Sequence, residues 1–184
     1  GLGLCCEEAA RIILTEKEKF SIDLPVFAKK KKFFEEREQV FGILQNRDIS
    51  MLERLESLSQ KYGMAFDCSN EKLYEFYMSL EMLDKSWEIQ LEKLKKADNN
   101  DVFKREDLQI FFEQLACYFI FRHFEKGVGF AVLSCLILGR LCSLCEDSEQ
   151  MIDMVRMYSS EIEYSEDNTE KVAKFLNGET YAKN

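Results

Sequence analysis

The 184-residue chain has few of the residues that interrupt regular structure and only one of the residue type most used in metal and acid–base sites. With 1 Pro and 8 Gly, it lacks the turn-forming residues of an all-β protein. Its 1 His excludes any site that needs two imidazoles. The most apolar stretch, Phe130–Leu138, is shorter than the roughly 18–20 residues of a membrane-spanning helix, and Arg140 follows it. We therefore expect a buried core helix there.

Basic residues are also in deficit, with 25 Lys and Arg against 34 Asp and Glu and a formal net charge of −9. This balance gives no electrostatic footprint for nucleic acid and disfavours anionic membranes, so we expect neither as a partner. The exception is a run of Lys at 29–32. Such a run is typical of a solvated helix face, and a patch for a substrate or partner is the alternative.

Apolar residues recur at the helical period along most of the chain, and no segment alternates as a strand would. Ser50 and Glu53 have the spacing of a capping box, Gly63 is placed to end the helix that follows, and Ser165 is placed to begin the last helix. The helices predicted are 6–14, 29–45, 50–63, 70–83, 87–94, 107–125, 130–145, 147–164 and 165–178.

These segments predict an all-α fold, an irregular multi-helix bundle of about eight to ten helices. The length suits one helical domain over 1–184. The polar stretch Ala97–Asp101, with the sequence ADNND, is the clearest linker, and a sub-division near 97–102 is the alternative.

The chain contains 7 Cys, an odd number, and most lie in apolar surroundings typical of reduced cytosolic thiols. Cys5 and Cys6 are adjacent and poorly placed to form a disulfide with each other. As thiolates they could join a metal or iron–sulfur site, which needs about four such ligands; two ordinary cysteines at a helix start are the alternative. Cys142 and Cys145 have redox or zinc spacing, but their apolar helix favours packed core thiols. A zinc site that also uses Cys135 is a weaker alternative.

Polar residues near the end of two predicted helices could meet. Arg122 and His123 end an aromatic run, and an acidic run occupies 161–167. Arg122 could form a buried ion pair with Glu161 or Glu163, while solvated charges are the default. Two kinds of site are missing: no glycine-rich loop follows a strand, and no hydrolytic triad can be assembled around the single His.

Three segments resemble the carboxy-terminal half of the flagellin lysine-N-methylase family: GLGLCCEEAARIIL (1–14), FFEQLACYFIFRHF (111–124) and YSSEIEYSEDN (158–168). ILQNRDISMLERL (43–55) fits between them. The resemblance implies an enzyme that methylates lysine side chains of flagellin with S-adenosylmethionine. It also implies a Cys-rich region that holds an iron–sulfur or other metal centre.

By this resemblance, Cys5 and Cys6 are the last members of a metal-ligand set whose other members precede Gly1. The candidate catalytic residues that it supplies are Arg122, His123, Glu161, Glu163 and Asn168. Ser160 and Tyr164 stand where the resemblance leads us to expect an Arg and a His. It assigns no residue to S-adenosylmethionine, and Tyr118 and Tyr164 are chemically suited to hold a cation.

We therefore expect a cytoplasmic fragment of a longer enzyme, inactive alone, that supplies a helical scaffold and a surface for flagellin. S-adenosylmethionine and an iron–sulfur cluster would belong to the full-length protein, and neither is expected on the fragment. A non-catalytic helical module for protein interaction is the alternative. The oligomeric state is not predicted.

Overall fold

The computed structural model describes residues 3–21, 31–66 and 68–176. Within these ranges the protein consists of nine α-helices joined by five short 3-10 or π turns, with no strand. This confirms the predicted all-α bundle. None of the helices described has the length and apolar character needed to cross a lipid bilayer.

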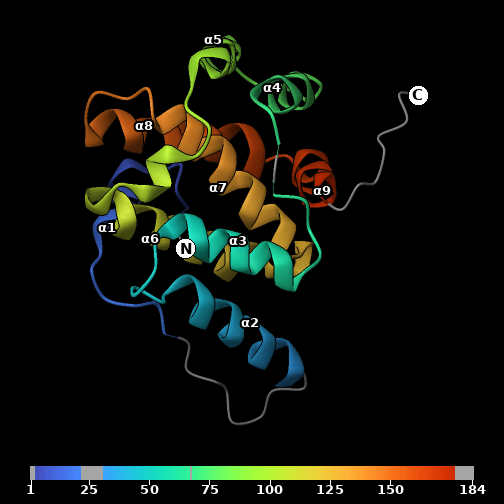
Figure 1. Ribbon diagram of the computed structural model, residues 1–184. Helices are drawn as coiled ribbons and strands as arrows, with labels where there is room; N and C mark the ends of the chain where they lie inside the picture. The colour runs from blue at the N-terminus through green and yellow to red at the C-terminus, as the bar shows by residue number, and fades with distance from the viewer. Residues whose placement is uncertain (1–2, 22–30, 67, 177–184) are drawn as a thin grey trace.

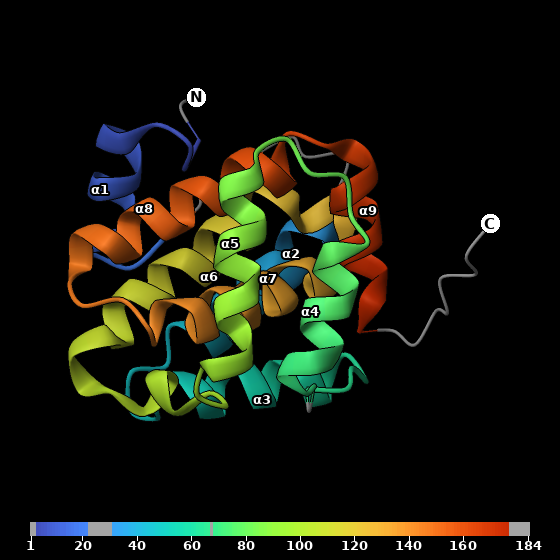
Figure 2. The same cartoon turned by 90° about the horizontal axis from the view of Figure 1, so that it is seen from above.

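The helices form a bundle around α7, Val128–Cys142, which runs through the middle of the molecule (Figures 1 and 2). All 15 of its residues are buried, as expected for a helix that is apolar on every side. The other helices are α1 Glu7–Thr15, α2 Lys31–Leu44, α3 Met51–Lys61, α4 Asn70–Met78, α5 Lys85–Lys93, α6 Gln109–His123, α8 Ser148–Tyr158 and α9 Glu166–Phe175.

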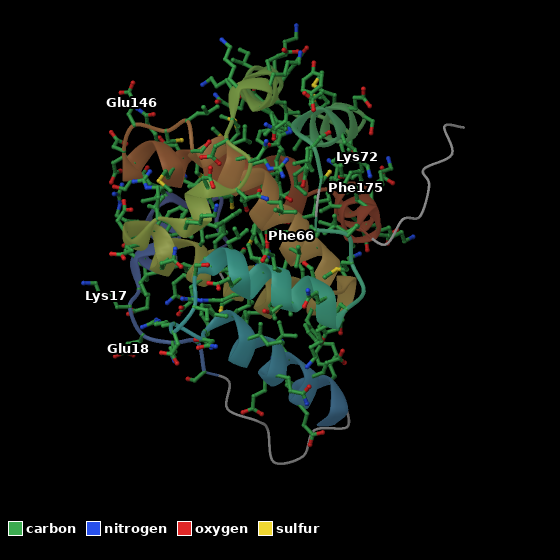
Figure 3. All side chains as sticks on the ribbon, in the orientation of Figure 1. Lys17, Glu18, Phe66, Lys72, Glu146 and Phe175 are labelled. Atoms are coloured by element: carbon green, nitrogen blue, oxygen red, sulfur yellow. The ribbon has the colours of Figure 1, made fainter. Side chains whose placement is uncertain are left out.

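Close packing against α7 depends on small residues and on aromatic side chains. A Cβ atom at Gly129 would lie 2.9 Å from the carbonyl oxygen of Ala173, so α9 approaches the α7 backbone directly. The outer face of α9 packs on α4, where the centres of the Phe76 and Phe175 rings lie 4.2 Å apart. Lys72 Nζ lies 5.4 Å from the centre of the Phe175 ring, and Figure 3 labels both residues.

The helix ends predicted from local signals are confirmed. Ser50 Oγ accepts a hydrogen bond from the Glu53 amide at 3.3 Å, and the Glu53 carboxylate accepts one from the Ser50 amide at 2.8 Å. Gly63 follows α3 with φ +64°. Ser165 Oγ accepts from the Asn168 amide at 3.2 Å and begins α9. The two serine caps satisfy backbone amides that have no partner within their helices.

Three predicted boundaries were wrong. The helix predicted over 70–83 stops at Met78, because α4 gives way to a turn that is bound by side chains from elsewhere. The helix predicted to begin at 130 begins at Val128. Gly127, with φ +94°, interrupts the helical run by itself, and Gly129 lies inside α7. The helix predicted over 147–164 ends at Tyr158 and continues as a π turn, Ser159–Glu163. The predicted stop at 178 and the side chains of the Lys run at 29–32 lie outside the described residues.

A buried ion pair joins the start of α6 to α3. Glu113 Oε2 lies 2.8 Å from Arg54 Nη1, and both side chains are 1% exposed. Glu113 Oε1 also pairs with Arg47 at 2.7 Å. The two guanidinium groups balance the carboxylate, which is what makes a charge tolerable at this depth.

Candidate functional site

A second buried carboxylate, Glu163, lies against the other end of α6. Its side chain is 1% exposed, and His123 Nε2 lies 2.6 Å from its Oε1 atom. Tyr118 OH donates to the same oxygen at 3.2 Å, and Arg122 Nε lies 3.4 Å from it. Ser159 Oγ donates to Oε2 at 2.5 Å. These five residues, Tyr118, Arg122, His123, Ser159 and Glu163, are called the Glu163 cluster below.

Two local features of the chain assemble this cluster. Tyr118 and Arg122 are four residues apart on α6 and so share one face, and His123 is the last residue of the helix. On the other side, the π turn contains one extra residue per turn and places Ser159 Oγ against the Glu163 carboxylate. Single π turns within helices are frequent at functional sites.

The tautomer of His123 follows from its contact with Glu163. An ionised carboxylate only accepts hydrogen bonds, so the Nε2 atom at 2.6 Å carries a hydrogen. In the neutral ring the lone pair is then on Nδ1. The ring packs on Phe130, with centroids 4.6 Å apart, and the side chain is 12% exposed. The cluster therefore contains an imidazole whose orientation is fixed by a carboxylate.

Tyr118 connects the cluster to the amino-terminal segment. Its hydroxyl oxygen accepts from the Leu4 amide at 3.3 Å while the hydroxyl donates to Glu163. Burial, with the charge of Glu163 as a second cause, raises the pKa of Tyr118 well above its ordinary value. The phenol thus stays protonated and remains a donor to Glu163 throughout the physiological pH range.

Cys5 lies at the edge of this cluster. Its Sγ atom is 2.9 Å from the hydroxyl of Tyr164, and Arg156 Nε donates to its carbonyl oxygen at 3.4 Å. The contact with Cys5 raises the pKa of Tyr164. Cys6 precedes α1, is half-buried, and makes no side-chain capping bond there. Both thiols are free and reach the surface in part.

The thiols and carboxylates of the described residues are too few in any one place to form a metal centre by themselves. Cys5 and Cys6 supply two thiols, whereas an iron–sulfur cluster takes about four. Among the described residues, no three His, Cys, Asp or Glu side chains gather as a metal site would require. The same finding applies to the alternative zinc site: Cys135 and Cys142 are buried and Cys145 half-buried.

Glu161 and Asn168 lie away from the Glu163 cluster and bind the turn between α4 and α5. The Glu161 carboxylate accepts from the amides of Leu83 at 2.8 Å and Asp84 at 3.0 Å. The Asn168 side chain accepts from the Glu81 amide at 3.1 Å and donates to the Glu81 carbonyl at 2.9 Å. Both side chains satisfy backbone groups of this turn, which accounts for the burial of Glu161 and Asn168 and for the end of α4.

The structure thus brings together three of the five candidate catalytic residues, Arg122, His123 and Glu163. Arg122 pairs with Glu163 as one of the two partners anticipated, but its side chain is 40% exposed and the pair is at the surface on the Arg side. Sequence reasoning missed Ser159. Its spacing of four residues before Glu163 was the available signal, since residues at that spacing share a helix face.

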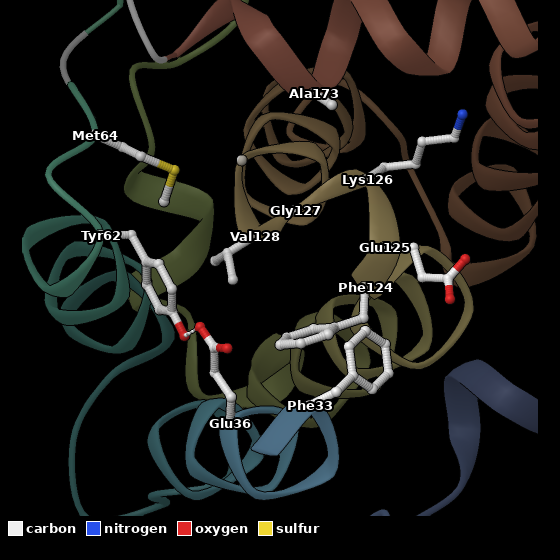
Figure 4. Close-up of a pocket in the computed structure, with 11 residues that line it drawn as sticks. Phe33, Glu36, Tyr62, Met64, Phe124, Glu125, Lys126, Gly127, Val128 and Ala173 are labelled. Atoms are coloured by element: carbon white, nitrogen blue, oxygen red, sulfur yellow. Dashed lines mark hydrogen bonds between the residues drawn. The ribbon is translucent and has the colours of Figure 1, made fainter. Parts of the chain in front are cut away.

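A cavity of about 430 Å³ lies at the connection between α6 and α7 (Figure 4). Phe124, the residue directly after His123, forms one wall. Tyr62 and Glu36 lie on the opposite side, with Met64 and Val128 completing the lining that faces the interior. Sequence reasoning did not anticipate this cavity, because its walls come from five separate helices or their ends, α2, α3, α6, α7 and α9.

Comparison of the chain with protein-family models, with curated proteins and with solved structures finds no match.

Proposed function

We propose that this chain is the carboxy-terminal helical part of a cytoplasmic lysine N-methyltransferase that acts on flagellin. One observation carries the proposal: the three segments that resemble the methylase family meet in one contact network. Segment 1–14 reaches segment 158–168 through Cys5 and Tyr164, which are 159 residues apart in sequence. Segment 111–124 reaches it through His123 and Glu163. Segments whose residues form one functional site are expected to resemble the same family together.

The chemistry of the Glu163 cluster fits such a reaction. Lysine attacks a methyl donor only as the neutral amine, so its ammonium must first lose a proton. With Nε2–H directed at Glu163, the imidazole of His123 offers Nδ1 as the proton acceptor. Glu163 stabilises the imidazolium that forms, and Tyr118 and Ser159 hold that carboxylate in place through hydrogen bonds.

S-adenosylmethionine, when bound, would supply an electrophilic methyl group on sulfur. An iron–sulfur or other metal centre would take Cys5 and Cys6 as two of its ligands, with the others supplied from outside the described residues. The residues of this chain would orient the amine, accept its proton and exclude water from it.

The proposal predicts that Glu163→Gln lowers methyl transfer. The enzyme expressed from its complete reading frame would be incubated with flagellin and S-adenosylmethionine labelled in the methyl group, and label in lysine would be counted. We expect a fall of about 100-fold or more in kcat, because the amide cannot stabilise an imidazolium. Glu166→Gln is the matched control: its carboxylate is 84% exposed and close in sequence.

Equal rates for Glu163→Gln and the parent would exclude the proposed role of the cluster. No label in lysine with the parent enzyme would exclude the methylase assignment itself and favour the alternative, a non-catalytic helical module for protein interaction.

A further inference from the structure

We propose that the cavity between Phe124 and Tyr62 binds an alkylammonium group of the size of a lysine side chain. The inference stands on the cavity alone; the assignment of that ammonium to the lysine of a protein substrate rests on the proposed function.

Aromatic rings and a thioether form the walls. The Phe124 ring is held by an edge-to-face contact with Phe33, at 4.8 Å between centroids and 86° between planes. Figure 4 shows the rings of Phe124 and Tyr62 on two sides of the cavity, with the sulfur of Met64 above them. Ring faces attract cations through the ring quadrupole, and a methylene chain packs well against both rings and sulfur.

A carboxylate projects into the same space. Figure 4 shows the Glu36 carboxylate between the two rings, with a hydrogen bond to Tyr62. Tyr62 OH donates to Glu36 Oε1 at 3.1 Å, a neutral donor that leaves the negative charge in place. Burial first, and then the charge of Glu36, raises the pKa of Tyr62 to about 12. The tyrosine therefore holds the carboxylate without neutralising it.

Among the described residues that line the cavity, the only Lys or Arg is Lys126, and it does not compete for this charge. Lys126 Nζ lies 3.3 Å from Glu166 and 3.5 Å from Glu170 on α9, and Figure 4 shows it pointing away from the interior. The side chain of Glu125 also points outward (Figure 4). A carboxylate between two rings, with methyl and thioether groups behind it, is complementary to an ammonium on an alkyl chain.

The volume is consistent with such a ligand. A cavity of about 430 Å³ falls within the range of small-molecule sites. The cavity wall at Gly129 is tightly packed. A Cβ atom at this position would lie 3.4 Å from Met64 Sδ and 2.9 Å from the Ala173 carbonyl oxygen. Ligands must therefore enter along the open side rather than displace the α7–α9 contact.

The test uses the methyl group of Met64 as a reporter, because it lines the cavity. The chain is labelled with ¹³C at methionine methyl groups and titrated with Nα-acetyl-lysine N-methylamide, with its Nε-acetylated neutral analogue, and with acetate. We expect a saturable shift of the Met64 resonance with the ammonium only. Glu36→Gln, which keeps the partner of Tyr62, should weaken binding about tenfold or more. Phe124→Leu should weaken it by a smaller factor.

Glu38→Gln is the matched control, since Glu38 is exposed on the same helix and lines a different hollow. An unmoved Met64 signal, an equal response to the neutral analogue or to acetate, or equal affinity in the Glu36→Gln variant would overturn the proposal. The experiment needs no methyl donor. Binding without methyl transfer would thus count against the proposed function and leave the cavity proposal standing. Methyl transfer without binding in the cavity would overturn the cavity proposal and leave the proposed function standing.

Discussion

Helix α6 carries two buried carboxylate clusters, one against each end, and they differ in their partners. Glu113 is matched by Arg54 and Arg47, whose guanidinium groups stay charged at any pH that a protein experiences. Glu163 is matched mainly by an imidazole, a phenol and a hydroxyl. Only the second set contains an imidazole, whose second ring nitrogen can accept a hydrogen bond or a proton.

The comparison separates a structural ion pair from a site suited to chemistry. Both carboxylates are 1% exposed, so burial alone does not distinguish them. In the first cluster the Arg54–Glu113 pair is enclosed, since Arg54 is also 1% exposed, and only Arg47 reaches the surface, at 34% exposure. In the second, His123 and Arg122 reach the surface, at 12% and 40% exposure. A substrate could meet Glu163's partners, whereas it could not reach Arg54.

The largest effect is expected from Arg54→Ala. Removing this side chain leaves the Glu113 charge buried with Arg47 as its remaining cation, and we expect a loss of about 3–5 kcal/mol in the free energy of unfolding. Denaturant unfolding monitored by circular dichroism measures it. The double variant Arg54→Met with Glu113→Leu should recover most of the loss, because the buried carboxylate is removed and the cation that remains, Arg47, is 34% exposed. A single variant as stable as the parent would contradict the enclosed pair.

Tyr118→Phe should have a smaller effect, visible as a change in pH dependence. The pKa of Tyr118 is raised in the folded protein, so above about pH 10 the unfolded chain releases this proton before the folded chain does. The unfolded state then binds fewer protons, and stability falls as pH rises. Thermal unfolding between pH 8 and 11 should show a shallower fall in the variant than in the parent. An identical slope would contradict the raised pKa of this buried phenol, whose first cause is burial.

The smallest effect is expected from Arg122→Ala. Its guanidinium is 40% exposed, and Glu163 keeps three other partners, so the loss should be about 1 kcal/mol or less. The sequence left a fully buried pair open as the alternative to solvated charges, and for that pair a loss of several kcal/mol would follow. The melting temperature of the variant, compared with that of Arg54→Ala, decides between the two. A loss above about 3 kcal/mol would restore the buried pair.

Local signals in the sequence predicted most of the fold. The capping box of Ser50 and Glu53, and the cap at Ser165, each involve residues within one turn, so their spacing alone indicates the contact. Helical periodicity located the helices for the same reason. The end of α4 at Met78 was not predictable, because it depends on Asn168, which is 87 residues from Glu81.

The candidate site was predicted in part. Arg122 and His123 end a recognisable helix, and the pairing of Arg122 with Glu163 was one of two buried pairings left open, whereas the contact of His123 with Glu163 was not predicted. The choice between Glu161 and Glu163 depends on the π turn, which helical periodicity does not indicate. The Glu113–Arg54 pair was missed altogether, since its members are 59 residues apart and neither stands in an unusual pattern. The cavity was missed for the same reason.

The extra residue in the π turn lets two nearby side chains point toward different parts of the bundle. Glu161 points to the α4–α5 turn and Glu163 to α6, although only one residue separates them. Deleting a single residue there would rotate everything downstream by about 100° relative to α8. Both carboxylates would lose their partners at once, and α9 would pack on α7 with a different face. The π turn should therefore tolerate substitutions far better than a change in its length.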